Sequence, residues 1–570
     1  MSRDWKRIRS ENFVAEGTAN TRSLQRWLDN LETFRACLQK VFPTINLTSS
    51  VPNRIIVIDG QRELLALAPL QPNGRPDPKV AGYFMPLADV NYFVVGGESD
   101  YAESTLYHEY AHFVLHNAVR GPIAGWLNEG FAEFYSTFAI NRNKREATIG
   151  LASQRLGVMR DGYLIPLNKI ITDEGEAEYR RDDLDIQRFY AQSWAMFHYL
   201  AVGHAGKRDG QLLRYIDAYA AGKPAEAAFQ DAFQPANTLH FELKDYLTRR
   251  SLPALMVALP ERESAMSGPE PMFDWESQVS RGRLLTSQGR LDEADKLLSP
   301  AREVVPDDEG VLHAMAALRR AQKRPDETVA LLKPVVARQT GSFGVRLEYA
   351  QGLTDVGQHS AAIDEYRQAA RINSRAASLW FGLSVSLAAV DKQDESDAAL
   401  SRVRALDADP GWIRARATAA WRHGIDKVVV GDTFRFTQLA GYKSESGTYA
   451  GFLGFLSARR IKDVQSTGIL LRELEAAIKP RTWPASVLAF FQGKLTPAAL
   501  LDRADGNGEL TEAHAYIGLV ASIDGKDQDA LPHLQWVVDG GSRNYIEYGL
   551  VLDEIVRRGL PIRASGPGRR

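Results

Sequence analysis

A repeat with a fixed period constrains the fold of this 570-residue chain more than any other feature. Four polar turns, GRLDEA, KRPDET, GQHSAA and DKQDES, begin at equal intervals, at Gly289, Lys323, Gly357 and Asp391. Small residues recur at the same period on both sides of the turns, where paired helices need close contact. They are Gly282, Ala316, Ala350 and Ser384 before the turn, and Ala294, Thr328, Ala362 and Ser396 after it. The pattern predicts stacked helix-turn-helix units over residues 275–410.

This pattern resembles the tetratricopeptide repeat (TPR), a pair of helices of about 34 residues that builds solenoids. The resemblance implies an all-α TPR solenoid whose groove binds a protein partner. Residues 449–560 show helical pairs again, with Gly518 and Ala530 spaced as the small residues of the first block are, and predict a second helical-repeat block. Between the blocks, residues 411–448 are poorly periodic and contain the run VVVGDTFRFTQL, which favours a strand pair. We expect an irregular connector there.

Mixed patterns precede the repeats. Residues 1–98 predict an α/β lobe, with an amphipathic helix in TRSLQRWLDNLETFRACLQKVF and half-buried strands in RIIVI and NYFVV. A helical domain is expected over residues 99–252, beginning with two helices at 101–117 and 126–141 that Gly121-Pro122 separates. Residues 253–274 are rich in Pro, Glu, Ser and Met and predict a linker.

Charge and cysteine content limit the classes of function. The 69 Lys and Arg residues nearly balance the 71 Asp and Glu residues, so no global field favours nucleic acid. No apolar run reaches the ~20 residues that a membrane span needs. The first residues, MSRDWKRIRSENFVAEG, lack the apolar stretch of a secretory signal, so a cytoplasmic location is the default expectation, and an exported one if the true start lies upstream. With Cys37 as the single cysteine, a metal site needs His and carboxylate ligands.

The segment LYHEYAHFVLH carries such ligands. His108 and His112 are one helical turn apart on a predicted helix, so both imidazoles project from one face and can share a metal ion. Glu109 follows the first of them. A catalytic zinc needs a third protein ligand and an open position, and WLNEGFAEF supplies Glu129, far enough beyond His112 for a turn and a return on a second helix. Glu133, one helical turn further, is placed to hydrogen-bond the free ring nitrogen of His108.

HEYAH followed by NEGFAEF resembles the gluzincin zinc peptidases, and most closely the peptidase-MA-like domains with WLNEGxAE. The resemblance covers about residues 50–250 and implies an α+β thermolysin-like zinc peptidase domain ahead of the TPR solenoid. It implies Zn²⁺ held by His108, His112 and Glu129, with Glu109 as general base. In FYAQSWAMFHYL, Tyr190 matches the family's oxyanion-stabilising tyrosine, and packing in the core is an equally good interpretation of this residue. Residues 82–95 match the edge strand that pairs with an extended peptide.

Several alternatives are weighed against this assignment. The GxMEN-like anchor of the aminopeptidases is missing, since AGYFMPLADVNYF stands in its region, so an endopeptidase is favoured. A metzincin site is excluded, because its Gly and third His would fall at Leu115 and Ala118, and His116 is not expected to be a ligand. The histidines His198, His204 and His240 have no spaced partners and are expected to be structural.

The sequence therefore predicts a zinc-dependent peptidase that hydrolyses a peptide or protein substrate, with repeats for protein-protein recognition. Two further hypotheses stay open. One is a catalytically silent TPR scaffold that retains a zinc site and binds peptides. The other is a hydrolase of a non-peptide amide, whose zinc chemistry would be the same.

Overall fold

The computed structural model describes residues 5–71, 73–97, 101–119, 123–152, 154–159, 162–171, 183–221, 223–235, 238–261, 265–338, 341–407 and 411–561. The expected turn at Gly121-Pro122 therefore lies outside the described residues. Two compact units are present, residues 1–352 with 368–376, and residues 353–367 with 377–570. In the described part of the chain, no helix is long and apolar enough to span a bilayer.

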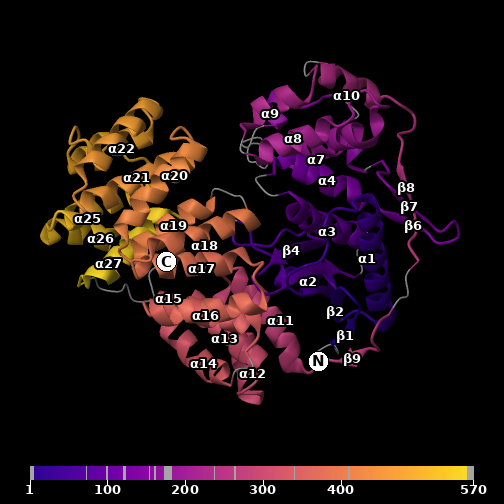
Figure 1. Ribbon diagram of the computed structural model, residues 1–570, viewed down its shortest axis with the longest axis horizontal. Coiled ribbons are helices and arrows are strands. Elements are labelled where there is room, and N and C mark those ends of the chain that lie inside the picture. Colours follow the sequence, from indigo (N-terminus) through magenta and orange to yellow (C-terminus); the bar gives the residue numbers. More distant parts are fainter. Residues whose placement is uncertain are drawn as a thin grey trace. The chain divides into compact units, whose positions relative to one another are not determined.

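Unit 1 is built on a six-stranded mixed sheet in the order β4-β5-β3-β2-β1-β9 (Figure 1). Strands β2, β3 and β5 run parallel, and the outer pairs β4-β5, β2-β1 and β1-β9 are antiparallel. The predicted strands RIIVI and NYFVV are β3 and β5 in the middle of this sheet. The bounds are β1 Lys6–Arg9, β2 Phe13–Gly17, β3 Asn53–Ile58, β4 Gly82–Pro86, β5 Asn91–Gly96 and β9 Glu270–Pro271.

Both faces of the sheet are covered, because successive side chains of a strand point to opposite sides. On β3, Ile55 and Val57 belong to a buried cluster with helices α1 (Thr21–Val41) and α3 (Ala102–Ala118). Their neighbours Ile56 and Ile58 belong to a second cluster that includes Leu64 of helix α2 (Gln61–Leu67) and apolar residues of the first repeats. The first repeats are therefore part of the same folded unit as the sheet.

Helices beyond α3 complete the N-terminal half of unit 1. The two predicted helices of the motif are α3 and α4 (Gly125–Ser136), and α4 ends earlier than the expected residue 141 because a short strand begins at Ala139. Figure 1 shows α7, α8, α9 and α10 gathered beyond α4, on its far side from the sheet. The bounds of the helices after α4 in this part are η1 Gln154–Met159, α5 Leu167–Ile170, α7 Asp183–His198, η2 Tyr199–Gly203, α8 Gln211–Ala220, α9 Ala225–Ala232 and α10 Leu239–Leu247.

The segment 253–274 is not a free linker, which corrects the expectation from its composition. Its first part forms β8 (Leu255–Ala258), which pairs with β7 (Glu146–Ile149) in a three-stranded sheet that β6 (Ala139–Asn141) completes. Its last part forms β9, which pairs with β1 at the edge of the large sheet. Proline is tolerated here because an edge strand has a side that makes no ladder hydrogen bonds.

The repeats predicted from the periodic pattern are helix pairs of the TPR type. All four turn residues identified in the sequence adopt positive φ, between +59° at Asp391 and +76° at Gly357. The left-handed conformation closes each helix and lets the chain reverse into the next one. The bounds are α11 Asp274–Ser287, α12 Leu291–Val304, α13 Glu309–Ala321, α14 Pro325–Ala337, α15 Phe343–Asp355, α16 His359–Ile372, α17 Ala377–Ala389 and α18 Gln393–Leu406.

Residues 411–448 are helical, which corrects the expectation of an irregular connector with a strand pair. They contain α19 (Gly411–Arg422) and α20 (Asp426–Ala440), so the repeat continues without a break of fold. The β-branched run that favoured strands lies in α20, where Val428, Val429 and Val430 are all buried. Burial on most sides of the helix outweighs the low helix propensity of valine. The later helices are α21 Glu445–Arg460, α22 Val464–Ala477, α23 Trp483–Phe491, α24 Pro497–Leu501, α25 Gly506–Ile523, α26 Asp527–Gly540 and α27 Ile546–Arg558.

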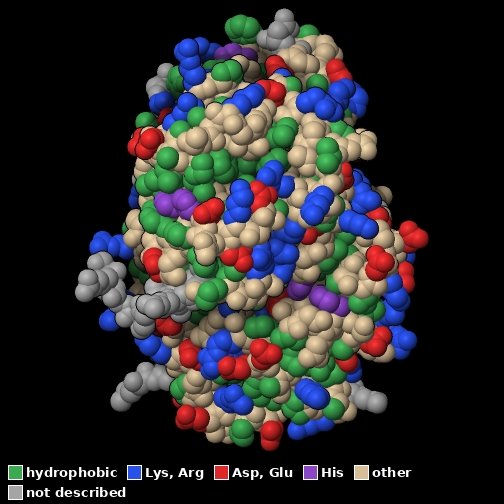
Figure 2. Space-filling view, turned by 90° about the vertical axis from the view of Figure 1, so that its left-hand side faces the viewer, with side chains coloured by type: hydrophobic (Ala, Val, Ile, Leu, Met, Phe, Trp, Pro, Cys, Tyr) green, Lys and Arg blue, Asp and Glu red, His purple; other side chains and the backbone are tan. Residues whose placement is uncertain are grey.

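Surface charge agrees with the balanced composition. On the face drawn in Figure 2, basic and acidic side chains are intermingled, with hydrophobic side chains between them. When charges of both signs lie within about a Debye length of one another, their electric fields largely cancel further out. This face therefore has no strong net potential that would attract a charged partner from a distance.

Candidate metal centre

Helix α3 places the two motif histidines on one face. Tyr107, Tyr110 and Val114 point into the main core and are at most 3% exposed, which fixes the rotation of the helix. His108 and His112, on the remaining face, are half-buried, with side chains 18% and 14% exposed. The helix is therefore anchored by one face and presents both imidazoles with the other.

Glu129 joins the histidines from the neighbouring helix α4. The close approach of α4 to α7 depends on the next residue, Gly130, where a Cβ atom would lie 2.4 Å from the backbone oxygen of Ser193. Only glycine fits at such a distance without a shift of one helix. Glu129 is 7% exposed, so its carboxylate is held inside the protein beside the imidazoles.

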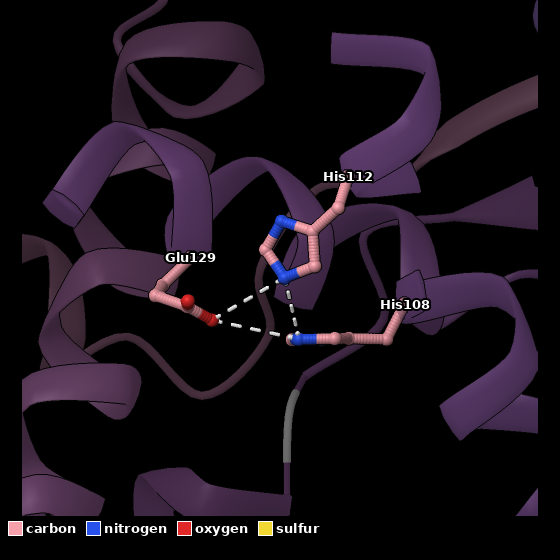
Figure 3. A group of neighbouring side chains, drawn as sticks. All are labelled: His108, His112 and Glu129. Atoms are coloured by element: carbon pink, nitrogen blue, oxygen red, sulfur yellow. Dashed lines mark hydrogen bonds and ion pairs between the residues drawn. The ribbon is translucent and has the colours of Figure 1, made fainter. Parts of the chain in front are cut away.

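The three side chains converge on one point (Figure 3). The Nε2 atoms of His108 and His112 are 3.0 Å apart, and Oε2 of Glu129 lies 3.5 Å from the first and 3.7 Å from the second. A tetrahedral zinc ion with bonds of ~2.0–2.1 Å separates its ligand atoms by about 3.3 Å. A point about 2.0 Å from all three atoms exists between them, which is the zinc–ligand distance. The distances between the three ligand atoms, and their donor chemistry, fit a zinc ion.

The outer contacts orient the two imidazoles. Nδ1 of His112 donates to Oδ1 of Asn128 at 3.0 Å, which leaves Nε2 as the lone-pair nitrogen that faces the cluster. Glu133, predicted to bind the ring of His108, has Oε1 3.6 Å from Nδ1 of that residue. This is an ion-pair distance and too long for a direct hydrogen bond. Asn128 was not identified from the sequence, although it directly precedes Glu129 in WLNEGFAEF.

Glu109 lies beside the cluster, on the wall of a cavity of about 890 Å³. The backbone of Phe84 on strand β4 lies beside this carboxylate and favours its charged form. Burial, and then the neighbouring carboxylate of Glu129, raise the pKa of Glu109 to about 8. A carboxyl group whose pKa lies near neutrality is suited to accept and release a proton. The backbone contact with β4 was not foreseen from the sequence, because it depends on tertiary structure.

Tyr190 is a further residue on the cavity wall. This residue lies on α7, is half-buried, and lines the same cavity as His108, Glu109 and Glu133. Gly82 of β4 lines it as well. Of the expected edge segment 82–95, only β4 lies at the edge of the sheet, since β5 is flanked by β4 and β3.

Among the described residues, His108, His112 and Glu129 form the one group of three or more potential ligands close enough to share an ion. His116 is not in it. His198 is buried and uses both ring nitrogens in the core, with Nε2 2.8 Å from the backbone oxygen of Gly150 and Nδ1 2.8 Å from the hydroxyl of Tyr246. This agrees with the structural role expected for His198.

No family model and no curated protein matches the chain. The solved structures similar to it include TPR proteins. A thermophilic TPR protein of Thermus thermophilus is 19% identical, with 31% of this chain and 98% of that one covered, at a TM-score of 0.26. PilF of Pseudomonas aeruginosa is 13% identical, with 39% and 98% covered and a TM-score of 0.28. A TPR protein of Parabacteroides merdae is 12% identical, with 50% and 99% covered and a TM-score of 0.27. Because these TM-scores are low, the repeat assignment rests on the helix pairs themselves.

Proposed function

We propose that the chain is a zinc-dependent peptidase of the gluzincin type, with a thermolysin-like arrangement around α3 and α4 and a repeat module for protein recognition. The observation that carries the proposal is the triangle of His108, His112 and Glu129 with Glu109 beside it on the cavity wall. A purely structural zinc site is normally closed by four protein ligands and does not need a carboxylate next to an open position.

His108, His112 and Glu129 would hold the zinc ion, which supplies Lewis acidity toward a scissile carbonyl and lowers the pKa of water in the site. Glu109 takes a proton from the attacking water and returns it to the leaving amine, as a general base and then a general acid. The Tyr190 hydroxyl, on the wall of the same cavity, donates a hydrogen bond to the developing oxyanion.

Strand β4 is the element proposed to bind the substrate backbone. It is an edge strand that pairs with β5, and its first residue, Gly82, lines the cavity. An extended peptide can add to such an edge as a further strand. This mode of binding selects for an extended polypeptide and favours an endopeptidase over an enzyme that acts on a small amide.

A decisive experiment measures zinc by mass spectrometry together with cleavage of a mixed peptide library. We expect one zinc per chain in the wild type and loss of zinc in Glu129→Ala. Glu109→Gln keeps the zinc and the shape of the side chain, and lowers cleavage by about 10²–10⁴-fold because the proton acceptor is gone. Glu103→Gln is the matched control, since Glu103 lies on the same helix and pairs with Arg26 outside the cavity.

The scaffold hypothesis has its own support in the TPR-type repeats, which present concave surfaces that bind proteins. Zinc binding without cleavage of any peptide would favour that hypothesis, or a non-peptide amide as substrate. Absence of zinc from the wild type, after purification with added metal, would contradict all three zinc-dependent hypotheses.

A further inference from the structure

The hairpin formed by β4 and β5 determines where the edge strand lies. β4 has one partner strand, with Phe84 opposite Phe93, and the rings of these two residues stack at a centroid distance of 4.7 Å. The turn between the strands closes with a hydrogen bond of 2.8 Å from the N–H of Leu87 to the oxygen of Val90. Among the described residues no strand lies on the other side of β4, so the position of this turn bears directly on the position of β4.

The position of β4 matters to the proposed catalytic residue. The backbone of Phe84 lies beside the Glu109 carboxylate, so a shift of the strand changes the surroundings of Glu109 directly. The strand also lies close to α3. A Cβ atom at Gly82 would be 3.0 Å from Cγ2 of Thr105 on that helix and 2.6 Å from the backbone oxygen of Val94 on β5. This part of the site tolerates little displacement.

The turn of the hairpin is held by the repeat module. Asp89, in the turn, forms an ion pair with Arg283 on α11, and its Oδ2 lies 3.8 Å from Nδ1 of His313 on α13. At Gly344, in the first turn of α15, a Cβ atom would be 2.6 Å from Oδ2 of Asp89. The first helices of three successive repeats therefore close around one carboxylate of the hairpin, and all four residues belong to unit 1.

The pair formed by Asp89 and Arg283 is largely shielded from water, with side chains 17% and 15% exposed. Burial by itself would raise the pKa of Asp89, but Arg283 and His313 together outweigh it and hold that pKa at about 2. Both groups are therefore charged at neutral pH. A shielded pair of full charges tolerates little change in geometry, because each partner would otherwise be left buried and unpaired.

We infer that Asp89 is a positioning residue through which the repeat module fixes edge strand β4 opposite Glu109. The first helices of these three repeats then serve the chain's own active site. The expected change in KM rests on the proposed peptidase function. Whether Asp89 holds the β4-β5 hairpin in place can be tested without any enzymatic activity.

The test compares Asp89→Asn with Glu276→Gln in the full-length protein loaded with zinc. Glu276 lies on α11, as Arg283 does, and pairs with Arg7 of β1. Strand β1 lies near the opposite edge of the sheet from β4. Both variants remove one ion pair between sheet and repeats, and only the first involves the hairpin. Two quantities are measured: amide hydrogen exchange in peptides covering 82–96, and KM and kcat for a long extended peptide and for a blocked dipeptide amide.

We expect Asp89→Asn to speed exchange in the hairpin and to raise KM for the long peptide roughly 10- to 100-fold, the range that a misplaced positioning element gives. The zinc content stays within about twofold, because the ligands are not touched. The KM of the dipeptide amide, which is too short to pair along β4, changes less than that of the long peptide. Glu276→Gln changes neither exchange in the hairpin nor KM. Asp89→Glu, which keeps the charge, stays closer to the wild type than Asp89→Asn in both measurements.

Unchanged exchange and unchanged KM in Asp89→Asn would overturn the inference, as would an equal effect in Glu276→Gln. If Asp89→Asn does not fold, Arg283→Lys replaces it, since that variant keeps the charge and loses the guanidinium fork. If the wild type shows no cleavage at all, the proposed function fails on its own, and hydrogen exchange still decides whether Asp89 holds the hairpin.

Discussion

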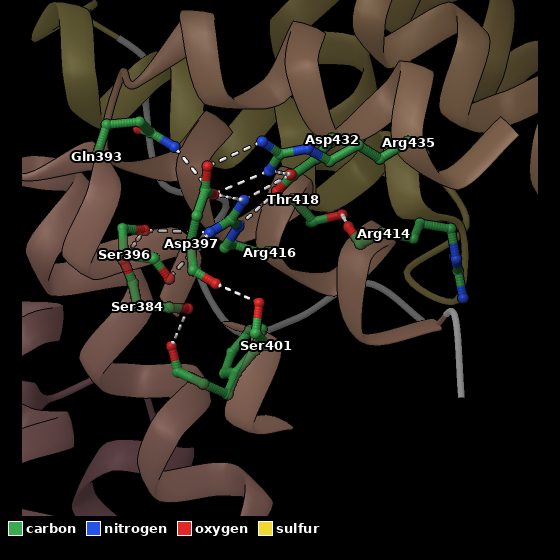
Figure 4. A network of polar contacts seen from close by, with 11 residues as sticks. Ser384, Gln393, Ser396, Asp397, Ser401, Arg414, Arg416, Thr418, Asp432 and Arg435 are labelled. Atoms are coloured by element: carbon green, nitrogen blue, oxygen red, sulfur yellow. Dashed lines mark hydrogen bonds and ion pairs between the residues drawn. The ribbon is translucent and has the colours of Figure 1, made fainter. Parts of the chain in front are cut away.

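Each compact unit contains a cluster of buried ionisable side chains, and the two clusters are built in opposite ways. In unit 2, Arg416 is fully buried and donates to both oxygens of Asp432, at 2.6 and 2.7 Å, and to Asp397 at 2.9 Å (Figure 4). Arg435 completes this network with two bonds of 2.8 Å to Asp397. Each carboxylate of the network has a guanidinium partner.

In unit 1, the cluster around His108 brings carboxylates and imidazoles together. The pKa of Glu109 rises through burial and the nearby carboxylate of Glu129, and the pKa of His112 falls to about 4 through burial and His108. By contrast, hydrogen bonds from Arg435 and Arg416 outweigh burial and lower the pKa of Asp397. Paired charges are typical of scaffolding, whereas groups pushed toward their neutral forms beside a cavity are typical of functional sites.

The strongest test of this contrast is Arg416→Met. It leaves Asp432 charged and buried without its main partner, so we expect a loss of about 3–5 kcal/mol in the free energy of unfolding of unit 2. Urea unfolding measures this loss, and the zinc content of unit 1 serves as the internal control. The double variant Arg416→Met with Asp432→Leu should recover most of the loss, and a single variant as stable as the wild type would show that the network is not scaffolding.

Binding of zinc should raise the free energy of unfolding of unit 1 alone. A ligand that binds only the folded state at a free concentration 100 times its Kd stabilises that state by about 2.7 kcal/mol. Calorimetry with and without a chelator measures the shift, and Glu129→Ala should remove it. Equal shifts in the transitions of both units, or a shift that survives in Glu129→Ala, would mean that zinc acts elsewhere.

A smaller effect is expected on the pH dependence of the stability of unit 2, at Glu512. Burial, and then Glu547, raise its pKa to about 8, although Tyr449 and Trp483 donate hydrogen bonds to it. A carboxyl group with a raised folded-state pKa contributes stability below its unfolded pKa of ~4.5 and loses it as the pH rises toward 8. Glu512→Gln should therefore flatten the decline in stability between pH 5 and 9. Glu473→Gln, at an exposed site in α22, should leave it unchanged.

The sequence predicted the turns of the four repeats and the convergence of His108, His112 and Glu129. The repeat period located the turns because each turn needs a residue in the left-handed region, and Lys323 and Asp391 adopt it as Gly289 and Gly357 do. The H-E-x-x-H spacing placed two imidazoles on one helical face. Glu129 was identified because it follows on the next helix, in the NEG segment that resembles the gluzincin pattern.

Two kinds of feature were missed: a repeat with an irregular period, and contacts between segments that are far apart in the sequence. The turn at Gly424, also at positive φ, comes one position too early after Asp391 for the strict period, which hid α19 and α20. Composition alone could not show that residues 253–274 add strands to two sheets, since strand pairing depends on partners far away in the sequence. The contact between Asp89 and the repeats was invisible for the same reason.

The strand β9 and the first repeats also bear on how the chain can be divided for expression. A fragment that ends at residue 252, where the composition changes, would lack β8, β9 and the helices that cover Ile56, Ile58 and Val94. It would expose an apolar sheet face and leave β1 as a new open edge, both of which promote aggregation. A recombinant catalytic fragment therefore has to include the repeats that complete unit 1.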